Sequence, residues 1–278
     1  MRIAMIDDAL IGYDRLGPVY LDRGLYFGDG VYEVLRSYEG QIFALEEHLG
    51  RFARSLREIG LPGVDIDAVR SRVMRGFEEA GFAEAKIYFH MTRGSGDRNH
   101  GGGETTKPNF FLTVMECPDS AAAKEKGVAV STFPDWRWKR CDIKSLNLLA
   151  NVLAKRDAEK KGCKEAILVN DAGEVTEGSS SAVFVVYDGQ VVTRPLGTEI
   201  LPSITRRFVC EAAENAGAGV AERVYSAADM QGADEVFLAV TTQDIVPVVR
   251  FDGKDVGAGR PGEVTKKLIE EFAKMVKK

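Results

Sequence analysis

The sequence predicts a mixed α+β or α/β protein of two domains: a smaller N-terminal α/β domain and a larger C-terminal pseudo-barrel domain. A chain of 278 residues with 45% hydrophobic residues has enough apolar material for two domains of ordinary size. The pattern breaks into small and charged residues over 119–127, which is typical of a linker. We therefore expect domains over 1–118 and 128–278.

The N-terminal half reads as strands alternating with helices. Runs of β-branched and aromatic residues predict strands, and the Glu39-Gly40 pair predicts a hairpin turn. Five apolar residues between 45 and 59 recur at helical spacing, and Gly60 follows as a stop signal. The expected strands cover 31–38, 41–43, 86–92 and 109–115, the expected helices cover 45–59 and 65–80, and a glycine-rich loop covers 94–107.

The C-terminal half contains more strands, and they follow one another more closely. Asp188-Gly189 and Asp252-Gly253 predict tight turns between strands. Closely spaced strands joined by such turns favour a barrel-like or sandwiched sheet over a doubly wound one. The expected strands cover 128–133, 165–169, 182–187, 190–193, 235–240 and 245–250, and the expected helices cover 147–161, 203–216 and 263–276.

The composition argues against several classes of function. The net charge of −5, with acidic and basic residues mixed along the chain, gives no broad basic field for nucleic acid. No segment has the roughly 20 apolar residues of a membrane span. Asp7 and Asp8 stand where a secretory signal needs an apolar core. We therefore expect a cytoplasmic protein. The four cysteines and three histidines lack metal-site spacing, so no metal is expected.

Lys144 and Glu177 are the side chains best suited to catalysis. Lys144 stands between small and apolar residues just before an expected helix, and a partly desolvated lysine becomes a usable nucleophile or proton carrier. A solvated surface charge is the alternative interpretation. Glu177 stands beside a glycine and three serines ahead of an apolar strand. It could hold a cationic ring nitrogen, or it could belong to a hydrogen-bonded turn.

Several further segments could bind anions. The helix start at Pro202-Ser203 leaves N–H groups free for a phosphate, although a plain N-cap is the alternative. Thr241-Thr242 follows a strand and offers two hydroxyls. His48 and Arg51 share one helix face, where they could support an anion or form an exposed ion pair. The loop segment Arg98-Asn99-His100 could catch a carboxylate.

Longer motifs connect these segments to one family. They are Phe27-Gly28-Asp29-Gly30-Val31-Tyr32-Glu33, Cys141-Asp142-Ile143-Lys144-Ser145-Leu146-Asn147, Val175-Thr176-Glu177-Gly178-Ser179-Ser180-Ser181 and Ile204-Thr205-Arg206. Together with His48, Arg51 and Thr241-Thr242, they closely resemble the D-amino acid aminotransferases of the fold-type IV pyridoxal-phosphate group. That group also contains branched-chain aminotransferases and aminodeoxychorismate lyase. The resemblance extends over nearly the whole chain, and its motifs are specific.

The resemblance implies a two-domain fold-type IV enzyme with pyridoxal 5'-phosphate as its cofactor. It makes Lys144 the Schiff-base lysine and the group that moves the substrate proton, and it pairs Glu177 with the pyridine nitrogen. The remaining cofactor contacts would come from Arg51, Ser180, Ile204, Thr205, Thr241 and Thr242. Relatives build the active site at a subunit interface, so the resemblance also implies a homodimer. Its partners would be small molecules, namely free amino acids and 2-oxo acids.

The same resemblance implies D-amino acid substrates, in a reaction of the type D-alanine + 2-oxoglutarate = pyruvate + D-glutamate. Tyr32 with Arg98 and His100 reproduces the carboxylate trap of D-amino acid aminotransferases, and Tyr88 is a further pocket residue. Arg36 resembles an arginine of the branched-chain enzymes and could supply or compete for this contact. Branched-chain L-aminotransferase, (R)-amine transaminase and aminodeoxychorismate lyase stay open as alternatives. A non-catalytic protein on the same fold is also open.

Overall fold

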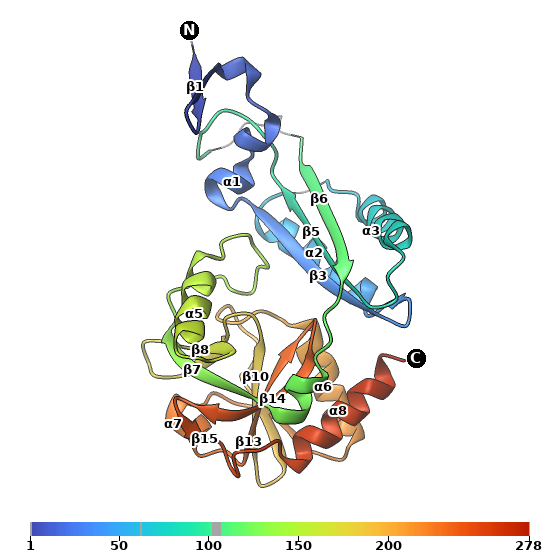
Figure 1. The fold of residues 1–278 in the computed structure, drawn as a ribbon, viewed down its shortest axis with the longest axis vertical. Coiled ribbons are helices and arrows are strands. Elements are labelled where there is room, and N and C mark those ends of the chain that lie inside the picture. The colour runs from blue at the N-terminus through green and yellow to red at the C-terminus, as the bar shows by residue number, and fades with distance from the viewer. Residues whose placement is uncertain (1, 62, 102–106, 278) are drawn as a thin grey trace.

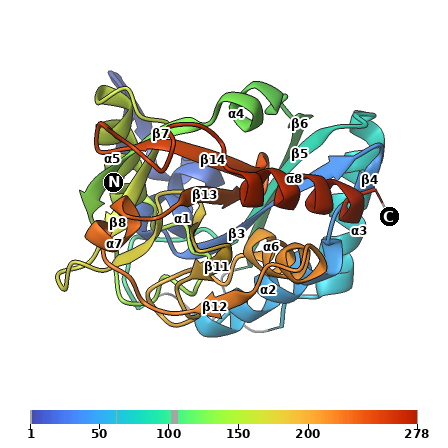
Figure 2. The same cartoon turned by 90° about the horizontal axis from the view of Figure 1, so that it is seen from below.

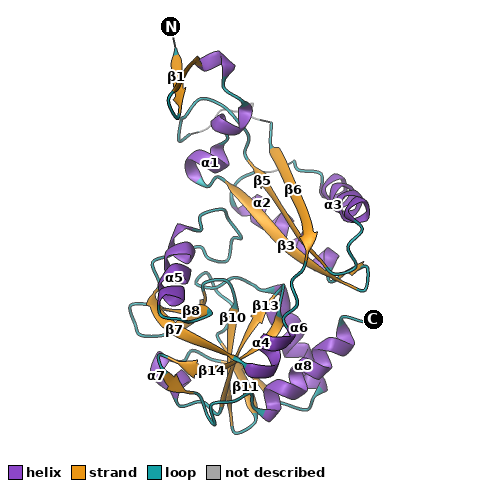
Figure 3. Cartoon of the chain, in the orientation of Figure 1, coloured by secondary structure: helices purple, strands orange, loops and turns teal. Residues whose placement is uncertain are grey.

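A computed structural model describes residues 2–61, 63–101 and 107–277. Its strands form one short hairpin and two larger sheets, and helices lie around the outside of both larger sheets (Figure 1; coloured by element type in Figure 3). Residues 102–106 of the predicted glycine-rich loop lie outside the described residues. The mixed helices and strands confirm the predicted fold class.

The first elements are short. Strands β1 (Ile3–Ile6) and β2 (Ala9–Gly12) form an antiparallel hairpin, and they are followed by the 3-10 turns η1 (Tyr13–Arg15) and η2 (Pro18–Leu21) and by helix α1 (Arg23–Phe27). The sequence pattern predicts none of these elements. Each has only three to five residues, which contain at most about one helical turn and too little alternation to mark a strand without a further signal.

The N-terminal sheet is antiparallel, in the order β4–β3–β5–β6. Its strands are β3 (Gly30–Tyr38), β4 (Gln41–Ile42), β5 (Ala85–Thr92) and β6 (Asn109–Glu116). Helices α2 (Leu45–Glu58) and α3 (Ile66–Ala80) cover one face of this sheet (Figure 1). These strands and helices confirm the elements predicted for this part of the chain.

Alternation along β3 and β5 decides which side chains reach the second sheet. Successive residues of a strand point to opposite faces. Val31, Leu35 and Phe89 are buried beneath the helices. Tyr32 and Val34 lie on the other face, where they line a cavity together with residues of the C-terminal half.

The C-terminal sheet is mixed and has the order β12–β11–β10–β13–β14–β7–β8–β9, with β15 paired to β14. Its strands are β7 (Val128–Pro134), β8 (Glu165–Val169), β9 (Val175–Gly178), β10 (Ala182–Tyr187), β11 (Gln190–Thr193), β12 (Val220–Glu222), β13 (Glu235–Val240), β14 (Asp244–Phe251) and β15 (Lys254–Asp255). The first and last parts of the order approach each other where β9 contacts β10, so the sheet is curled. This curl confirms the predicted barrel-like form.

Four helices of the segment after β7 pack around the curled sheet (Figure 2). Buried apolar residues lie on both faces of the sheet. The four helices are α5 (Leu149–Lys160), α6 (Ile204–Asn215), α7 (Ala227–Gln231) and α8 (Glu263–Met275). Helices α5, α6 and α8 confirm predicted elements, whereas the short elements α7, β12 and β15 were not predicted. None of the helices in the described ranges combines the length and apolar character that a membrane crossing needs.

The predicted linker contains a helix, α4 (Ala121–Lys126). Its Lys124 ammonium lies 2.5 Å from a carboxylate oxygen of Asp244 on β14, so the segment is packed against the C-terminal sheet. The domain boundaries at 119–127 stay a prediction. The segment before β10 also differs from the turn considered above, since Val175–Gly178 forms a strand that pairs with β8.

Candidate active site

A cavity of about 710 Å³ lies between the two large sheets and is lined by both Lys144 and Glu177. Strand β3 contributes Tyr32 and Val34, and the C-terminal half contributes the turn that follows β13 and the residues just before α6. Small-molecule sites usually measure roughly 300 to 1,000 Å³. The cavity therefore has the size of a ligand site and collects residues that are far apart in the sequence.

The backbone of Lys144 is hydrogen-bonded to strand β3 and to helix α2. The Tyr32 N–H on β3 donates to the Lys144 carbonyl at 3.0 Å, and the Lys144 N–H donates to Ser55 Oγ of α2 at 3.2 Å. Its side chain is half-buried, and Nζ lies 4.4 Å from the centre of the Tyr32 ring. The amine thus enters the cavity from a fixed backbone position.

Glu177 faces the same cavity from the end of β9 and is buried. The Leu201 N–H donates to its two oxygens at 3.2 and 3.1 Å, and the Arg137 guanidinium forms an ion pair with Oε1. Burial raises the pKa of Glu177, and the Arg137 guanidinium opposes this effect. A cationic group placed against this carboxylate would act in the same direction as Arg137 and would lower the pKa of Glu177. The site is therefore suited to holding a positive ring nitrogen.

Arg137 is a functional candidate that the sequence pattern does not reveal. Its guanidinium also binds Asp135 at 2.7 Å and the Glu199 carbonyl at 3.0 Å, and its side chain is 6% exposed. A single arginine in a loop carries no periodic or spacing signal, and its partner Glu177 is 40 residues away in the sequence. Only the folded chain brings the two side chains together.

One end of the cavity is suited to a phosphate. Ser203 caps α6 and accepts from the Arg206 N–H at 3.1 Å, while the other N–H groups of the first turn lack a carbonyl partner from the preceding turn. The Thr205 and Thr241 hydroxyls lie 3.5 Å apart. Ser203, Thr241 and Thr242 line the cavity. Ile204 forms the first residue of the helix.

Arg51 closes this end of the cavity from α2. Its Nη1 donates to the Pro202 carbonyl at 3.1 Å, just before α6, and its Nε and Nη2 each donate to one oxygen of Glu33 at 2.8 Å. His48 Nδ1 lies 2.8 Å from Glu33 Oε2. Arg51 and His48 are buried, so the exposed ion pair considered above is wrong. They contact Glu33, which the sequence pattern alone does not single out.

Electrostatics make the Glu33 cluster a stable support for Arg51. Burial raises the pKa of Glu33, but the Arg51 and His48 contacts outweigh burial and bring it to about 2. Burial lowers the pKa of His48, so the neutral imidazole donates its Nδ1–H to Glu33 at neutral pH. Arg51 therefore keeps its place with one edge on Glu33 and another toward the cavity.

Ser180 lines the cavity on the turn between β9 and β10. Its hydroxyl donates to Glu165 Oε2 at 2.6 Å, and the Ser179 and Ser181 hydroxyls contact the same carboxylate. Glu165 is buried on β8. The three consecutive serines are thus anchored to one carboxylate, which orients the turn beside Glu177.

Arg36 lies outside the residues that line the Lys144 cavity. Its Nη1 donates to the Thr242 carbonyl and to Asp244 Oδ1, both at 3.1 Å, and its Nη2 lies 3.5 Å from Glu84. Tyr88 is also absent from the described lining residues, although its ring lies 5.8 Å from that of Tyr32. The contacts of Arg36 show that its guanidinium is already paired with the carboxylates of Asp244 and Glu84.

Arg98 and His100 do not join the Lys144 cavity within this chain, as far as its described lining residues go. Both are exposed, and both contact Phe27 of α1, with the His100 ring 5.0 Å from the phenyl ring. Buried Arg23 donates to the Asn99 carbonyl at 2.5 Å and to the His100 carbonyl at 3.0 Å. Arg23 thus anchors the backbone of this loop outside the Lys144 cavity of the same chain.

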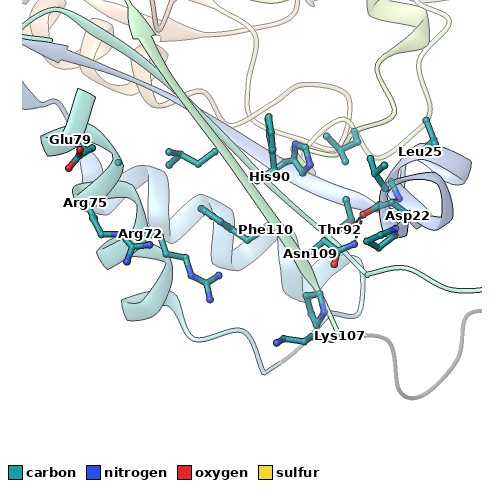
Figure 4. A pocket seen from close by; sticks show the side chains of 18 residues that line it. Asp22, Leu25, Arg72, Arg75, Glu79, His90, Thr92, Lys107, Asn109 and Phe110 are labelled. Carbon is teal, nitrogen blue, oxygen red and sulfur yellow. Dashed lines mark hydrogen bonds between the residues drawn. The ribbon is translucent and has the colours of Figure 1, made fainter. Parts of the chain in front are cut away.

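A second, larger cavity of about 1360 Å³ lies against β6 and α1 (Figure 4). Its wall includes Leu25, Arg72 and His90, and contains none of the predicted cofactor residues. Leu25 is 65% exposed and Phe111, which also lines it, is 49% exposed. Its size alone does not make it the active site, because the acid/base and anion-binding groups gather in the smaller cavity. No cluster of three potential metal ligands occurs among the described residues.

The fold and the Lys144 cavity define the class of this protein. The family model for amino-transferase class IV matches residues 30–251. The chain belongs to this family. The matched region contains both large sheets apart from β15, and every group described in the cavity.

The chain is similar to known enzymes in sequence and in structure. The D-alanine aminotransferase of Bacillus licheniformis is 39% identical over 250 residues, covering 89% of this chain and 87% of that protein. The D-alanine aminotransferase of Staphylococcus epidermidis is 38% identical over 279 residues, covering 99% and 98%.

Solved structures agree on the fold. The branched-chain amino acid aminotransferase of Escherichia coli has a TM-score of 0.87 at 25% identity, covering 96% of this chain and 92% of that one. A fold IV transaminase from Curtobacterium pusillum has a TM-score of 0.82 at 25% identity, covering 97% and 93%. The fold is therefore that of fold-type IV aminotransferases.

Proposed function

We propose that this chain is a pyridoxal 5'-phosphate-dependent aminotransferase that transfers amino groups between D-amino acids and 2-oxo acids. The reaction is of the type D-alanine + 2-oxoglutarate = pyruvate + D-glutamate. The observation that carries the proposal is the cavity that joins Lys144, Glu177 and the α6 phosphate site. The relatives that are 38–39% identical over most of the chain are D-alanine aminotransferases, which supports D-substrates.

The residues of the cavity fit the cofactor. Lys144 Nζ would bind it covalently, and Glu177 would hold a proton on its ring nitrogen. Its phosphate would be bound by Arg51, Ile204, Thr205 and Thr241 through side chains or backbone N–H groups, and Ser180 and Thr242 would add further contacts to the cofactor. When bound, pyridoxal phosphate withdraws electrons from the substrate Cα and makes its proton acidic. The Lys144 amine would take this proton from Cα and deliver it to C4′ of the cofactor, as transamination requires.

The substrate carboxylate is assigned to Arg98 and His100, together with Tyr32. Arg36 is a weaker candidate because Asp244 and the Thr242 carbonyl already engage its guanidinium. Arg98 and His100 are exposed and lie outside the cavity of their own chain. We therefore propose a homodimer in which this loop reaches the Lys144 cavity of the second copy.

Exposed apolar side chains next to this loop support the homodimer. Leu25 lies on α1, the helix whose Phe27 contacts His100, and it is 65% exposed. Phe111 is 49% exposed on β6. Contiguous exposed apolar side chains of this kind mark interaction surfaces in soluble proteins. We also propose a cytoplasmic location, because the four cysteines are unpaired thiols, as is usual in reducing compartments.

The reaction and its stereochemistry are tested by half-reactions of the cofactor-loaded enzyme. The visible absorbance of the bound cofactor is followed with D-alanine, D-glutamate, L-leucine, L-glutamate, (R)-phenylethylamine and aminodeoxychorismate. We expect bleaching by both D-amino acids and none with Lys144→Ala on the same timescale. Bleaching by L-leucine alone would identify a branched-chain enzyme, and bleaching by the amine alone an (R)-amine transaminase. Pyruvate release from aminodeoxychorismate would identify the lyase, and no cofactor uptake would support a non-catalytic protein.

The shared site is tested with mixed dimers purified through two different tags. A dimer of one Lys144→Ala subunit and one Arg98→Ala subunit should keep about half of the wild-type activity toward D-alanine, since one of its two sites is intact. The reciprocal dimer, which combines the double variant with a wild-type subunit, has one defect in each site and should be nearly inactive. The opposite pattern would show that Arg98 acts within its own subunit.

A further inference from the structure

Lys86 is a half-buried cation on the wall of the Lys144 cavity. It lies on β5 directly opposite Arg36 of β3, and therefore on the same sheet face as Tyr32 and Val34. Among the described residues, no carboxylate oxygen lies within the 4.0 Å of an ion pair to its ammonium group. A partly desolvated ammonium without a counter-ion is a favourable place for an anion.

The carboxylates nearest to Lys86 along the sheet already have other partners. Asp244 binds Arg36 at 3.1 Å and Lys124 at 2.5 Å. Glu84 lies directly before β5, two residues ahead of Lys86, and its carboxylate is 3.5 Å from the Arg36 guanidinium. Arg36 and Lys124 thus engage both carboxylates, and neither carboxylate forms an ion pair with Lys86, which lines the cavity.

The other cations of the cavity are engaged differently. Arg51 is bound to Glu33, and Arg137 is bound to Glu177. The half-buried Lys155 donates to the Lys164 carbonyl. Arg156 and Lys164 are exposed, where water and salt screen their charge. Beside Lys86, Val34 offers an apolar wall that can contact methylene groups. This part of the cavity therefore combines an apolar surface with a cation.

We propose that Lys86 binds the side-chain carboxylate of acidic substrates and so determines a preference for D-glutamate, D-aspartate and dicarboxylic 2-oxo acids over neutral substrates of the same size. The inference rests on the proposed D-amino acid transamination and assigns a specificity residue to that site. Lys86 suits this role because its flexible stem can place one charge against either chain length. Its contribution is to binding of the substrate side chain, while Lys144 performs the proton transfer.

The test compares D-glutamate with D-glutamine, which has nearly the same shape and no side-chain charge. Half-reaction rates of the cofactor-loaded enzyme are measured over a range of substrate concentrations. In Lys86→Met, the D-glutamate to D-glutamine ratio of rate constant over half-saturating concentration should fall roughly tenfold to a hundredfold, the usual effect of losing a charge-assisted hydrogen bond. The loss should appear in the half-saturating concentration of D-glutamate and leave its limiting rate constant within about twofold.

Two variants serve as controls. Lys86→Arg keeps the charge and should retain most of the D-glutamate preference, which also guards against a folding defect in the methionine variant. Arg156→Met removes an exposed cation at the rim and should leave the ratio within about twofold. Equal loss for D-glutamate and D-glutamine in Lys86→Met, or the same ratio change in Arg156→Met, would overturn the role of Lys86. Wild-type enzyme that no D-amino acid bleaches would instead refute the proposed function.

Discussion

Glu33 carries a charge in a fully buried position, and its neighbours explain why this is tolerated. Its two oxygens receive both N–H groups of the Arg51 fork at 2.8 Å, and His48 adds a third contact. Paired and hydrogen-bonded charges can offset the cost of burial, whereas a single unpaired one cannot. The cluster therefore holds a cation toward the phosphate end of the cavity without leaving a bare charge in the core.

Glu33→Gln should remove most of this pH-dependent stabilisation. The folded pKa of about 2 lies below the ordinary value of 4.5, so the contribution is complete above about pH 4.5 and is lost as the pH falls toward 2. The shift corresponds to about 3 kcal/mol. Urea unfolding between pH 3 and 7 should show a shallower acid loss and a lower stability at pH 7 in the variant.

Glu46→Gln is the matched control, because Glu46 lies on α2, the helix of Arg51 and His48, and forms an exposed ion pair with Arg70 of α3. Exposed pairs are screened by water and salt, so its unfolding midpoints should stay close to those of the wild type. An unaltered acid profile in Glu33→Gln would contradict the assignment of Glu33 as the stabilising carboxylate.

At the scale of elements, α1 has only five residues and yet adjoins the active-site segment. Its C-cap Gly28 has a φ of +65°, a left-handed conformation that favours glycine. A Cβ at this position would lie 2.2 Å from Asn147 Oδ1 and 3.4 Å from the Asn147 nitrogen. Asn147 lines the Lys144 cavity, so the end of α1 fixes one wall of the site.

Gly28→Ala should therefore impair cofactor binding as well as stability. The positive φ costs about 1 kcal/mol, and displacement of Asn147 should add roughly 1 to 3 kcal/mol. Gly40→Ala is the control, since Gly40 also has a positive φ of +85° but a Cβ added there would have no atom within 4 Å. Both variants are compared by urea unfolding and by titration with pyridoxal phosphate. Equal effects of the two substitutions would show that the Asn147 contact is unimportant.

At the scale of the whole molecule, Asp244 joins three separate parts of the chain. It accepts from Arg36 of the N-terminal sheet at 3.1 Å, from Lys124 of α4 at 2.5 Å and from the Tyr38 hydroxyl. The same Arg36 binds the Thr242 carbonyl in the turn that lines the cavity. This buried cluster therefore connects the placement of the two sheets to the geometry of the site.

Asp244→Asn should lower the free energy of unfolding by about 3 to 5 kcal/mol, because it leaves two cations without their shared carboxylate. Asparagine tolerates the positive φ of 60° at this position, so backbone strain should not contribute to the loss of stability. Asp188→Asn, at an exposed turn with a φ of 49°, should change stability by less than about 0.5 kcal/mol. The free energies of unfolding of both variants are measured by chemical denaturation of the cofactor-loaded enzyme. Equal free energies for the two variants would refute the role of the cluster.

The longer elements could be predicted because the pattern that produces them is local. Apolar residues at helical spacing mark α2, and alternating or continuous β-branched runs mark β10 and β13. Short elements were recognised where a glycine turn or an apolar run marks them, as at β4, β8 and β11. Helix α1 and strand β12 contain less than one or two periods and could not be recognised in this way. Their positions follow from packing against the larger elements.

The sequence by itself determined the longer strands and helices, since these depend on local pattern, and it predicted Lys144 and Glu177 as site residues from motifs within short segments. The tertiary structure decided what those residues meet. Arg137 reaches Glu177 across 40 residues, and Arg36 reaches Asp244 across 208. Such pairs depend on how the sheets pack, because burial makes an unpaired charge costly and leaves few arrangements that satisfy every partner.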